Sequence, residues 1–498
     1  MRSLKTGLSV ALNQSPFLNV ASDDKVVATL RLMARPPDTK LTPAVSRLAF
    51  KRAGHVLCFA YIMAAFCAGT HNQACSQSIE VSPSSAIADQ TLTIQVHGLK
   101  PGEAIILRAF MHDKDGREWQ SYAGFMPDAH GNIDLSRQSP VTGTYQGISP
   151  MGLILSMQLP NPDYGRARFN YEWATPLVTK LVAESDGKLL ASTEFSRTFA
   201  APDVTTRVVR TDGLVGTLFV PPGTGPFPAL IALGGSEGGN SAEDVGALLS
   251  SHGYVCLALA YFGADSLPGS LEEIPLEYFV RALDWLADQK LVSRNRIGIL
   301  GTSKGAEAAL LLAARDSRIR AVVAYEPSGV VWSCLCEGTG KSSWSWKGGP
   351  VAFVPFQEDP ANRPPEGFPM RIGHNYEFSL NNKPAVQKAS IPVEMINGPI
   401  LLISGKDDQL WPSFRLGKGI MQRLAARHHR FRDRQLAYPD AGHLIGKAYL
   451  PVGATLIAGG QIETGGNLWG NAKAQEDSWP NVLTFLHHAL TDPLAMAG

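Results

Sequence analysis

Residues 296–303 read RIGILGTS, an apolar run typical of a strand, and KGAEAALLLAARD at 304–316 has helical period. The junction contains a G-x-S-x-G motif centred on Ser303. Between a strand and a helix this motif indicates a nucleophilic serine: the sharp turn exposes the hydroxyl, and Gly301 and Gly305 avoid collisions with the neighbouring strand and helix. A serine N-cap after a glycine turn is the alternative interpretation.

A nucleophilic serine requires a base and an orienting carboxylate, which follow in the order Ser, Asp, His on this type of sheet. The run ILLISG ends before two aspartates, and we favour Asp408, because the pattern G-x-x-D-x-x-x-P places it just past the strand. Asp407 is the alternative. The next run, RQLAYPD, leads to His443, the predicted base, for which a solvated loop histidine is the other interpretation. Four other histidines lie on helix-like stretches with ordinary surface explanations: His428, His429, His487 and His488.

Acyl transfer also needs hydrogen-bond donors for the oxyanion. The strand ALIAL is followed by the loop GGSEGG at 234–239, in which the backbone N–H of Ser236 or Glu237 is one predicted donor. The N–H of Lys304 is the other. A dinucleotide or phosphate cradle is disfavoured, because the loop lacks G-x-G-x-x-G and no P-loop Lys-Ser/Thr follows.

These residues require a sheet whose strand ends meet at one edge. From about residue 204 onward, nearly unbroken apolar runs alternate with segments of helical period, which predicts a parallel sheet covered on both faces. Chemistry is expected at the carboxyl ends of its strands. An irregular stretch at 330–395, rich in Trp and Pro, predicts an insertion that forms a lid or lines a pocket.

Residues 77–203 have a different pattern, with short alternating strands separated by turn dipeptides such as Asp115-Gly116. Strands without intervening helices predict a β-sandwich with a supporting or substrate-contacting role. The expected fold class is therefore α/β: an α/β-hydrolase domain at 204–498, preceded by an immunoglobulin-like β-sandwich at 77–203.

Composition narrows the possible functions. The 498 residues carry a formal net charge of +1 and 18% charged residues, so no long-range field favours nucleic acid or anionic lipid. Six cysteines are too few and too unevenly placed for a disulfide framework, and their spacing indicates no metal site. Cys334 and Cys336 are interpreted as plain loop or surface sulfur. We expect no cofactor and leave the oligomeric state open.

The first 76 residues form a predicted disordered leader. Within it, 47–76 combine a basic flank, the apolar run VLCFAYIMAAFCAG and a polar exit, a pattern typical of a signal peptide. At 14 residues (56–69), the run is shorter than the roughly 20 that span a bilayer, so a stable membrane span is not expected. If the signal functions, the protein is exported or periplasmic; otherwise it is cytoplasmic.

Taken together, the motifs GLVGTLFVPPG, LGGSEGG, GTSKGAE, ISGKDDQLWPS and AGHLIGKAYLP resemble the acyl-CoA thioesterase and bile acid-CoA:amino acid N-acyltransferase family from about residue 80 to the end. The resemblance implies a triad of Ser303, Asp408 and His443 acting on an acyl-CoA thioester. Because the amino-acid-conjugating branch typically carries cysteine at the nucleophile position, the serine favours hydrolysis in fatty acid metabolism. N-acyl transfer, a general carboxylesterase and an inactive binding module are the alternatives.

Overall fold

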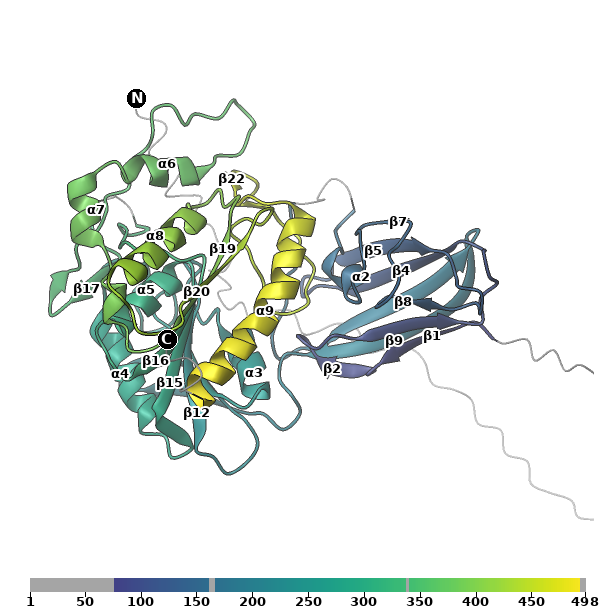
Figure 1. Ribbon diagram of the computed structural model, residues 1–498, viewed down its shortest axis with the longest axis horizontal. Helices are drawn as coiled ribbons and strands as arrows, with labels where there is room; N and C mark the ends of the chain where they lie inside the picture. The colour runs from purple at the N-terminus through teal and green to yellow at the C-terminus, as the bar shows by residue number, and fades with distance from the viewer. Residues whose placement is uncertain (1–75, 161–165, 337–339, 493–498) are drawn as a thin grey trace, which may run out of the picture. The chain divides into compact units, whose positions relative to one another are not determined.

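The computed structural model describes residues 76–160, 166–336 and 340–492 (Figure 1). The predicted signal-like segment lies outside the described residues, apart from its last residue. The amino-terminal part consists of two sheets, and the carboxyl-terminal part of a large sheet flanked by helices.

The two amino-terminal sheets are built from short strands with alternating burial. One has the order β1-β3-β6 and the other β2-β9-β8-β4-β5-β7, and every pair except β2 with β9 is antiparallel. Buried side chains of β3 and β4, among them Ile94 and Leu107, belong to one hydrophobic cluster. The short helix α2 was not expected among these strands, and the immunoglobulin-like class stays a prediction. The elements are β1 (Ser78–Ser82), β2 (Ser85–Ile87), β3 (Thr93–His97), β4 (Ile105–His112), β5 (Glu118–Phe125), β6 (Ile133–Asp134), β7 (Thr142–Gly143), α2 (Gly152–Leu155), β8 (Leu177–Ser185) and β9 (Lys188–Thr198).

The large sheet has eight strands in the order β10-β11-β13-β12-β15-β16-β19-β20. β10 and β11 pair antiparallel at one edge, and all pairs from β13 to β20 are parallel, as the alternating sequence pattern predicts. The carboxyl ends of the parallel strands therefore meet at one edge. The strands are β10 (Thr205–Thr211), β11 (Leu214–Val220), β12 (Phe227–Leu233), β13 (Val255–Ala260), β15 (Val292–Thr302), β16 (Ile319–Tyr325), β19 (Ile400–Gly405) and β20 (Arg434–Tyr438).

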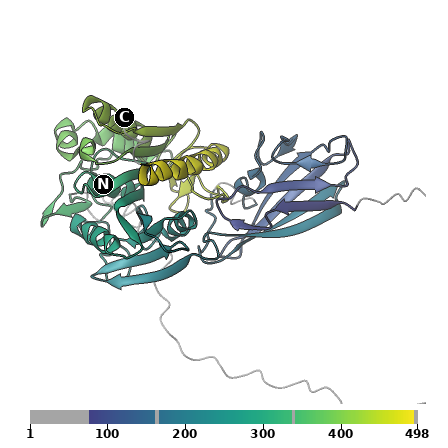
Figure 2. The ribbon, with the colours of Figure 1, turned by 60° about the horizontal axis from the view of Figure 1, so that its bottom comes forward.

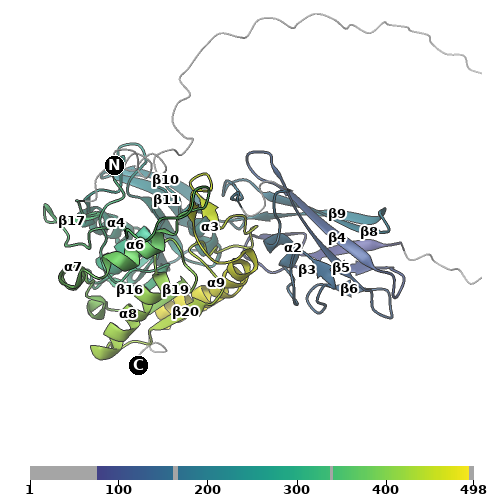
Figure 3. The same cartoon turned by 90° about the horizontal axis from the view of Figure 1, so that it is seen from above.

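Helices cover both faces of this sheet (Figures 2 and 3). Successive strand residues alternate between two hydrophobic clusters: Leu230 and Leu300 join α3 and α9 on one face, whereas Ile231 and Ile299 join α4, α5 and α8 on the other. This two-faced burial explains why the strands are almost continuously apolar. The helices are α3 (Glu243–Ser251), α4 (Leu276–Ala287), α5 (Lys304–Ala313), α8 (Ser413–Ala426) and α9 (Leu468–Thr491).

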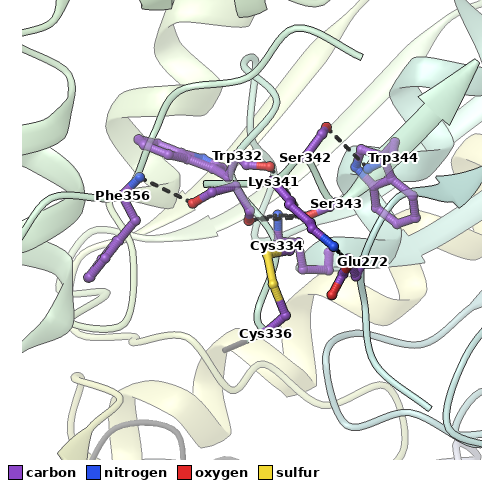
Figure 4. Close-up of a disulfide and its surroundings, with 11 residues drawn as sticks. Glu272, Trp332, Cys334, Cys336, Lys341, Ser342, Ser343, Trp344 and Phe356 are labelled. Atoms are coloured by element: carbon purple, nitrogen blue, oxygen red, sulfur yellow. Dashed lines mark hydrogen bonds and ion pairs between the residues drawn. A yellow bond between two sulfur atoms is a disulfide. The ribbon is translucent and has the colours of Figure 1, made fainter. Parts of the chain in front are cut away.

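The predicted insertion at 330–395 contains small elements and a disulfide. Cys334 and Cys336 are bonded to each other with their Cα atoms 5.4 Å apart, and Cys334 is buried (Figure 4). The interpretation as plain loop or surface sulfur is therefore wrong; the chain turns sharply enough between them to bring both sulfurs together. The remaining elements are β14 (Ile274–Pro275), β17 (Trp344–Trp346), β18 (Gly349–Pro350), α6 (Ile372–Ser379), α7 (Lys383–Ala389), the 3-10 helix η1 (Val393–Met395), β21 (Leu456–Ile457) and β22 (Ile462–Glu463).

Candidate active site

Ser303 occupies the turn between β15 and α5 in a conformation that few non-glycine residues adopt. Its φ is 55° and ψ is −116°, and its N–H donates to the Tyr325 carbonyl at 2.9 Å. A Cβ on Gly301 would lie 2.2 Å from the Gly305 carbonyl oxygen, and one on Gly305 would lie 2.1 Å from that of Gly234. The glycines are therefore required by close backbone approach, and the strained turn is held from both sides.

The structure brings three predicted residues together at the carboxyl edge of the sheet. His443 Nε2 lies 3.0 Å from Ser303 Oγ, and His443 Nδ1 lies 2.9 Å from Asp408 Oδ2. The imidazole and the Asp408 carboxylate are almost completely buried. Asp407 is not part of this group, because its carboxylate accepts from the Gly466 N–H instead. The arrangement allows a hydroxyl proton to pass to an imidazole that a carboxylate holds in place.

Backbone donors fix the orientation of Asp408. Its Oδ1 accepts from the N–H groups of Leu410 and Trp411 at 3.0 and 3.1 Å. Burial by itself lowers the pKa of His443, but the charge and hydrogen bond of Asp408 raise it, with further contributions from Glu326 and Glu237. The pKa of His443 lies above its ordinary value, which suits a base that must hold a proton during the reaction.

The predicted oxyanion loop lies beside the nucleophile. A Cβ on Gly235 would be 3.4 Å from Ser303 Cβ, so the buried part of the loop reaches the serine. Ser236 and Glu237 follow it and are exposed, whereas Lys304 is buried as the first residue of α5. The loop is therefore near enough to serve, and the choice of donors stays a prediction.

The Lys304 side chain has a structural environment that the sequence analysis did not address. Its Nζ lies 3.2 Å from Glu307 Oε2 and donates to Ser343 Oγ at 2.8 Å. Glu307 also accepts from Trp344 Nε1 at 2.7 Å and from the Trp332 N–H at 3.2 Å. This buried ion pair connects the helix behind the nucleophile to the insertion, whose labelled side chains are shown in Figure 4.

A second buried acid near the triad, Glu326, was missed by the sequence analysis. It follows β16 directly, is 0% exposed and has a φ of 45°. The available signal was a charged residue placed between the apolar run AVVAY and Pro327, at the edge where chemistry was expected.

The loop that follows His443 is held by the amino-terminal sheets. Fully buried Arg197 of β9 donates to the Tyr449 carbonyl, and the Tyr449 N–H donates to the Ala88 carbonyl at 3.0 Å. Lys447, in the same loop, donates to Thr302 Oγ1 at 2.9 Å, next to the nucleophile. These contacts fit the supporting role predicted for the amino-terminal part.

One of the other histidines differs from expectation. His429 has a buried side chain that contacts Asp433 Oδ2 at 2.6 Å, so the ordinary surface explanation is wrong for it. His428, His487 and His488 are exposed.

Across the described ranges, no three His, Cys, Asp or Glu side chains converge on a position that could hold a metal ion. None of the helices in the described part of the chain is both long and apolar enough to cross a membrane.

A mainly parallel sheet with a serine at a strand-to-helix turn, and with Asp and His on later loops, defines an α/β hydrolase. Two family profiles match the chain: "Acyl-CoA thioester hydrolase/BAAT N-terminal region" at 89–211 and "BAAT / Acyl-CoA thioester hydrolase C terminal" at 274–492. Acyl-coenzyme A thioesterase 1 of Rattus norvegicus is 33% identical over 411 residues, which cover 81% of this chain and 94% of that protein. The chain belongs to the acyl-CoA thioester hydrolase/BAAT family of enzymes.

The chain is also similar to a second curated relative and to solved structures. Acyl-coenzyme A amino acid N-acyltransferase 1 of Mus musculus is 31% identical over 420 residues, covering 82% of this chain and 97% of that protein. Among solved structures, a putative dienelactone hydrolase from Klebsiella pneumoniae aligns over 57% of this chain and 97% of its own, with a TM-score of 0.35 and 16% identity. That TM-score is low, and the fold class rests on the sheet topology described above.

Proposed function

We propose that this enzyme hydrolyses fatty acyl-CoA to free fatty acid and CoA through an acyl-enzyme on Ser303. The observation that supports this most is the buried His443 ring, which contacts Ser303 through one nitrogen and Asp408 through the other. Membership of a family whose relatives include acyl-CoA thioesterases supports the substrate class. We also propose that residues 77–203 form an immunoglobulin-like domain and that the hydrolase domain begins at residue 204.

In the proposed mechanism, His443 Nε2 takes the Ser303 proton while Oγ forms a bond to the thioester carbonyl carbon. Backbone N–H groups of Lys304 and of Ser236 or Glu237 stabilise the oxyanion. The C–S bond breaks, the CoA sulfur receives the proton from the imidazolium, and the acyl group remains on Oγ. His443 then deprotonates a water molecule, whose oxygen forms a bond to the acyl carbon. The bond from that carbon to Oγ breaks, Oγ takes the proton back from the imidazolium, and the fatty acid is released. Asp408 stays ionised and stabilises each imidazolium.

N-acyl transfer is the second candidate, favoured by the similarity to the Mus musculus N-acyltransferase. The two activities differ only in whether water or an amine attacks the acyl-enzyme. Incubation with palmitoyl-CoA, with and without glycine or taurine, separates them: we expect palmitate and free CoA in both cases. Formation of an amide product would show that the enzyme is an N-acyltransferase and would overturn the proposed hydrolysis.

A carboxylesterase and an inactive binding module are separated by two further measurements. Rates on CoA esters of different chain length are compared with rates on p-nitrophenyl esters, and higher kcat/KM on the CoA esters supports the proposal. A fluorophosphonate probe tests the nucleophile: labelling of wild type and not of Ser303→Ala is expected. Absence of labelling in the native wild type would favour a binding module.

A further inference from the structure

The backbone of Glu326 takes part in the hydrogen bonds that hold Ser303 and Asp408 in place. The peptide group that joins Tyr325 and Glu326 accepts from the Ser303 N–H through its carbonyl, and its own N–H donates to the Ile403 carbonyl at 2.8 Å. The Glu326 carbonyl accepts from Trp411 Nε1 at 3.1 Å, and the Trp411 N–H in turn bonds Asp408. Glu326 is therefore fixed between the strand end beside Ser303 and the turn that carries Asp408.

The carboxyl group of Glu326 is buried without a good hydrogen bond. Neither oxygen has a partner among the described residues, and the Ile445 N–H approaches the carboxyl without reaching good hydrogen-bond geometry. A buried carboxyl without such donors is costly to ionise. Burial raises the pKa of Glu326 to about 8, so the group changes charge at mildly alkaline pH.

The charged and titratable groups that face Glu326 come from several elements. Lys447 and His443 favour its ionised form, and Asp408 opposes it. Tyr325 is the adjacent phenol, whose pKa is raised mainly by burial and also by Glu326. Glu237 faces His443 from the oxyanion loop. Among these groups, His443 is the one whose charge changes during the proposed reaction.

We propose that Glu326 is a second acidic positioning residue of this site, acting through His443: its ionised carboxyl favours the imidazolium that forms when Ser303 loses its proton. Protonation of His443 in turn favours ionisation of Glu326, because opposite charges stabilise one another in a buried site. The inference rests on the proposed function, since it assigns the imidazole the role of base. It adds an acid that the Ser, Asp, His motif does not contain.

The test measures the second-order rate at which a fluorophosphonate labels Ser303 as a function of pH, in wild type, Glu326→Gln and Glu326→Asp. Labelling slows at low pH as His443 becomes protonated. Because the pKa of Glu326 is about 8, its charge acts on His443 only near and above that pH, so we expect the wild-type rate to show a second rising limb between about pH 7 and 9, which Glu326→Gln should lose. Glu326→Asp should restore this second limb. Glu394→Gln, which removes a carboxylate paired with Arg423 away from the triad, should leave the limb unchanged.

A merely structural role for Glu326 would lower the rate at every pH without removing the second limb, and a second limb that persists in folded Glu326→Gln overturns the inference. If that variant does not fold, infrared titration of the wild type supplies the answer. We expect a buried protonated carboxyl band that disappears near pH 8, and its absence between pH 5 and 7 would overturn the inference. Ser303→Ala separates the two proposals: full thioesterase activity in that variant refutes the proposed function, whereas an inactive Ser303→Ala together with a second limb that persists in Glu326→Gln refutes only the role of Glu326.

Discussion

Two fully buried glutamates, one in the helix after the nucleophile and one at the end of a neighbouring strand, have opposite surroundings. Glu307, in α5, is contacted by Lys304 and by two tryptophan N–H groups, whereas Glu326, after β16, has no good donor in the described residues. The first acid is compensated and connects α5 to the insertion. The second is uncompensated by any hydrogen-bond donor of good geometry, and its ionised form is favoured through charge by Lys447 and His443. We expect the first acid to maintain structure and the second to respond to protons.

Removal of the nucleophile should have the largest effect on activity. Ser303→Ala should lower thioester turnover by about a millionfold, because the acyl-enzyme cannot form. The melting temperature should stay near that of wild type, since the change removes only one oxygen. Turnover is measured by release of free CoA from palmitoyl-CoA, and turnover near the wild-type rate would exclude the mechanism.

Asp408→Asn should produce the next largest effect, a loss of about ten-thousandfold in kcat. The amide cannot stabilise the imidazolium and favours the wrong tautomer of His443. Asp407→Asn is the matched control, because its side chain bonds Gly466 instead, and its kcat should stay near wild type. Equal losses in the two variants would show that Asp408 has no special role.

Removing the charge of Glu307, the compensated acid, should lower the stability of the fold. Glu307→Gln leaves the buried Lys304 ammonium without a counter-charge, so we expect the free energy of unfolding to fall by about 3 to 5 kcal/mol. The control is Glu377→Gln, which removes one partner of an ion pair with Arg415 whose side chains are each about half exposed, and which should cost less than about 1 kcal/mol. Urea denaturation measures both, and a small loss in Glu307→Gln would contradict the distinction between the two acids.

Glu326, the uncompensated acid, should make the stability of the fold depend on pH. The pKa of Glu326 is about 8 in the folded protein and has an ordinary value of 4.5, so the unfolded chain releases this proton first and folding stability decreases as pH rises between these values. Between pH 5 and 7, wild type should lose about 2 to 3 kcal/mol relative to Glu326→Gln. Parallel stability curves for the two proteins would show that folding does not raise the pKa of Glu326.

The sequence predicted those parts of the site that a short motif specifies. Gly301, Ser303 and Gly305 are fixed by backbone crowding at one turn, and that requirement is visible in five consecutive letters. Asp408 and His443 could be placed because each lies in the loop that follows a predicted strand. Asp408 could be favoured over Asp407 on spacing alone, and the structure gives it the contact with the imidazole.

Features that depend on side chains meeting across the fold were not predictable. Glu307 pairs with Lys304 one helical turn away, but its burial depends on Trp332 and Trp344 from the insertion, whose path the sequence does not specify. The Cys334 and Cys336 disulfide depends on a local turn that spacing alone does not reveal. Glu326 could not be singled out from the sequence, because its isolation from hydrogen-bond donors is a property of the folded interior.

Arg197 limits how this enzyme can be divided. Its guanidinium reaches from β9 to the Tyr449 carbonyl, only a short distance along the chain from the imidazole. An isolated fragment beginning at residue 204 would lose that hydrogen bond, and the loop that carries His443 would be less firmly held. For protein engineering, the catalytic domain therefore cannot simply be fused to another amino-terminal domain: the new domain would have to supply a cationic donor at the same place.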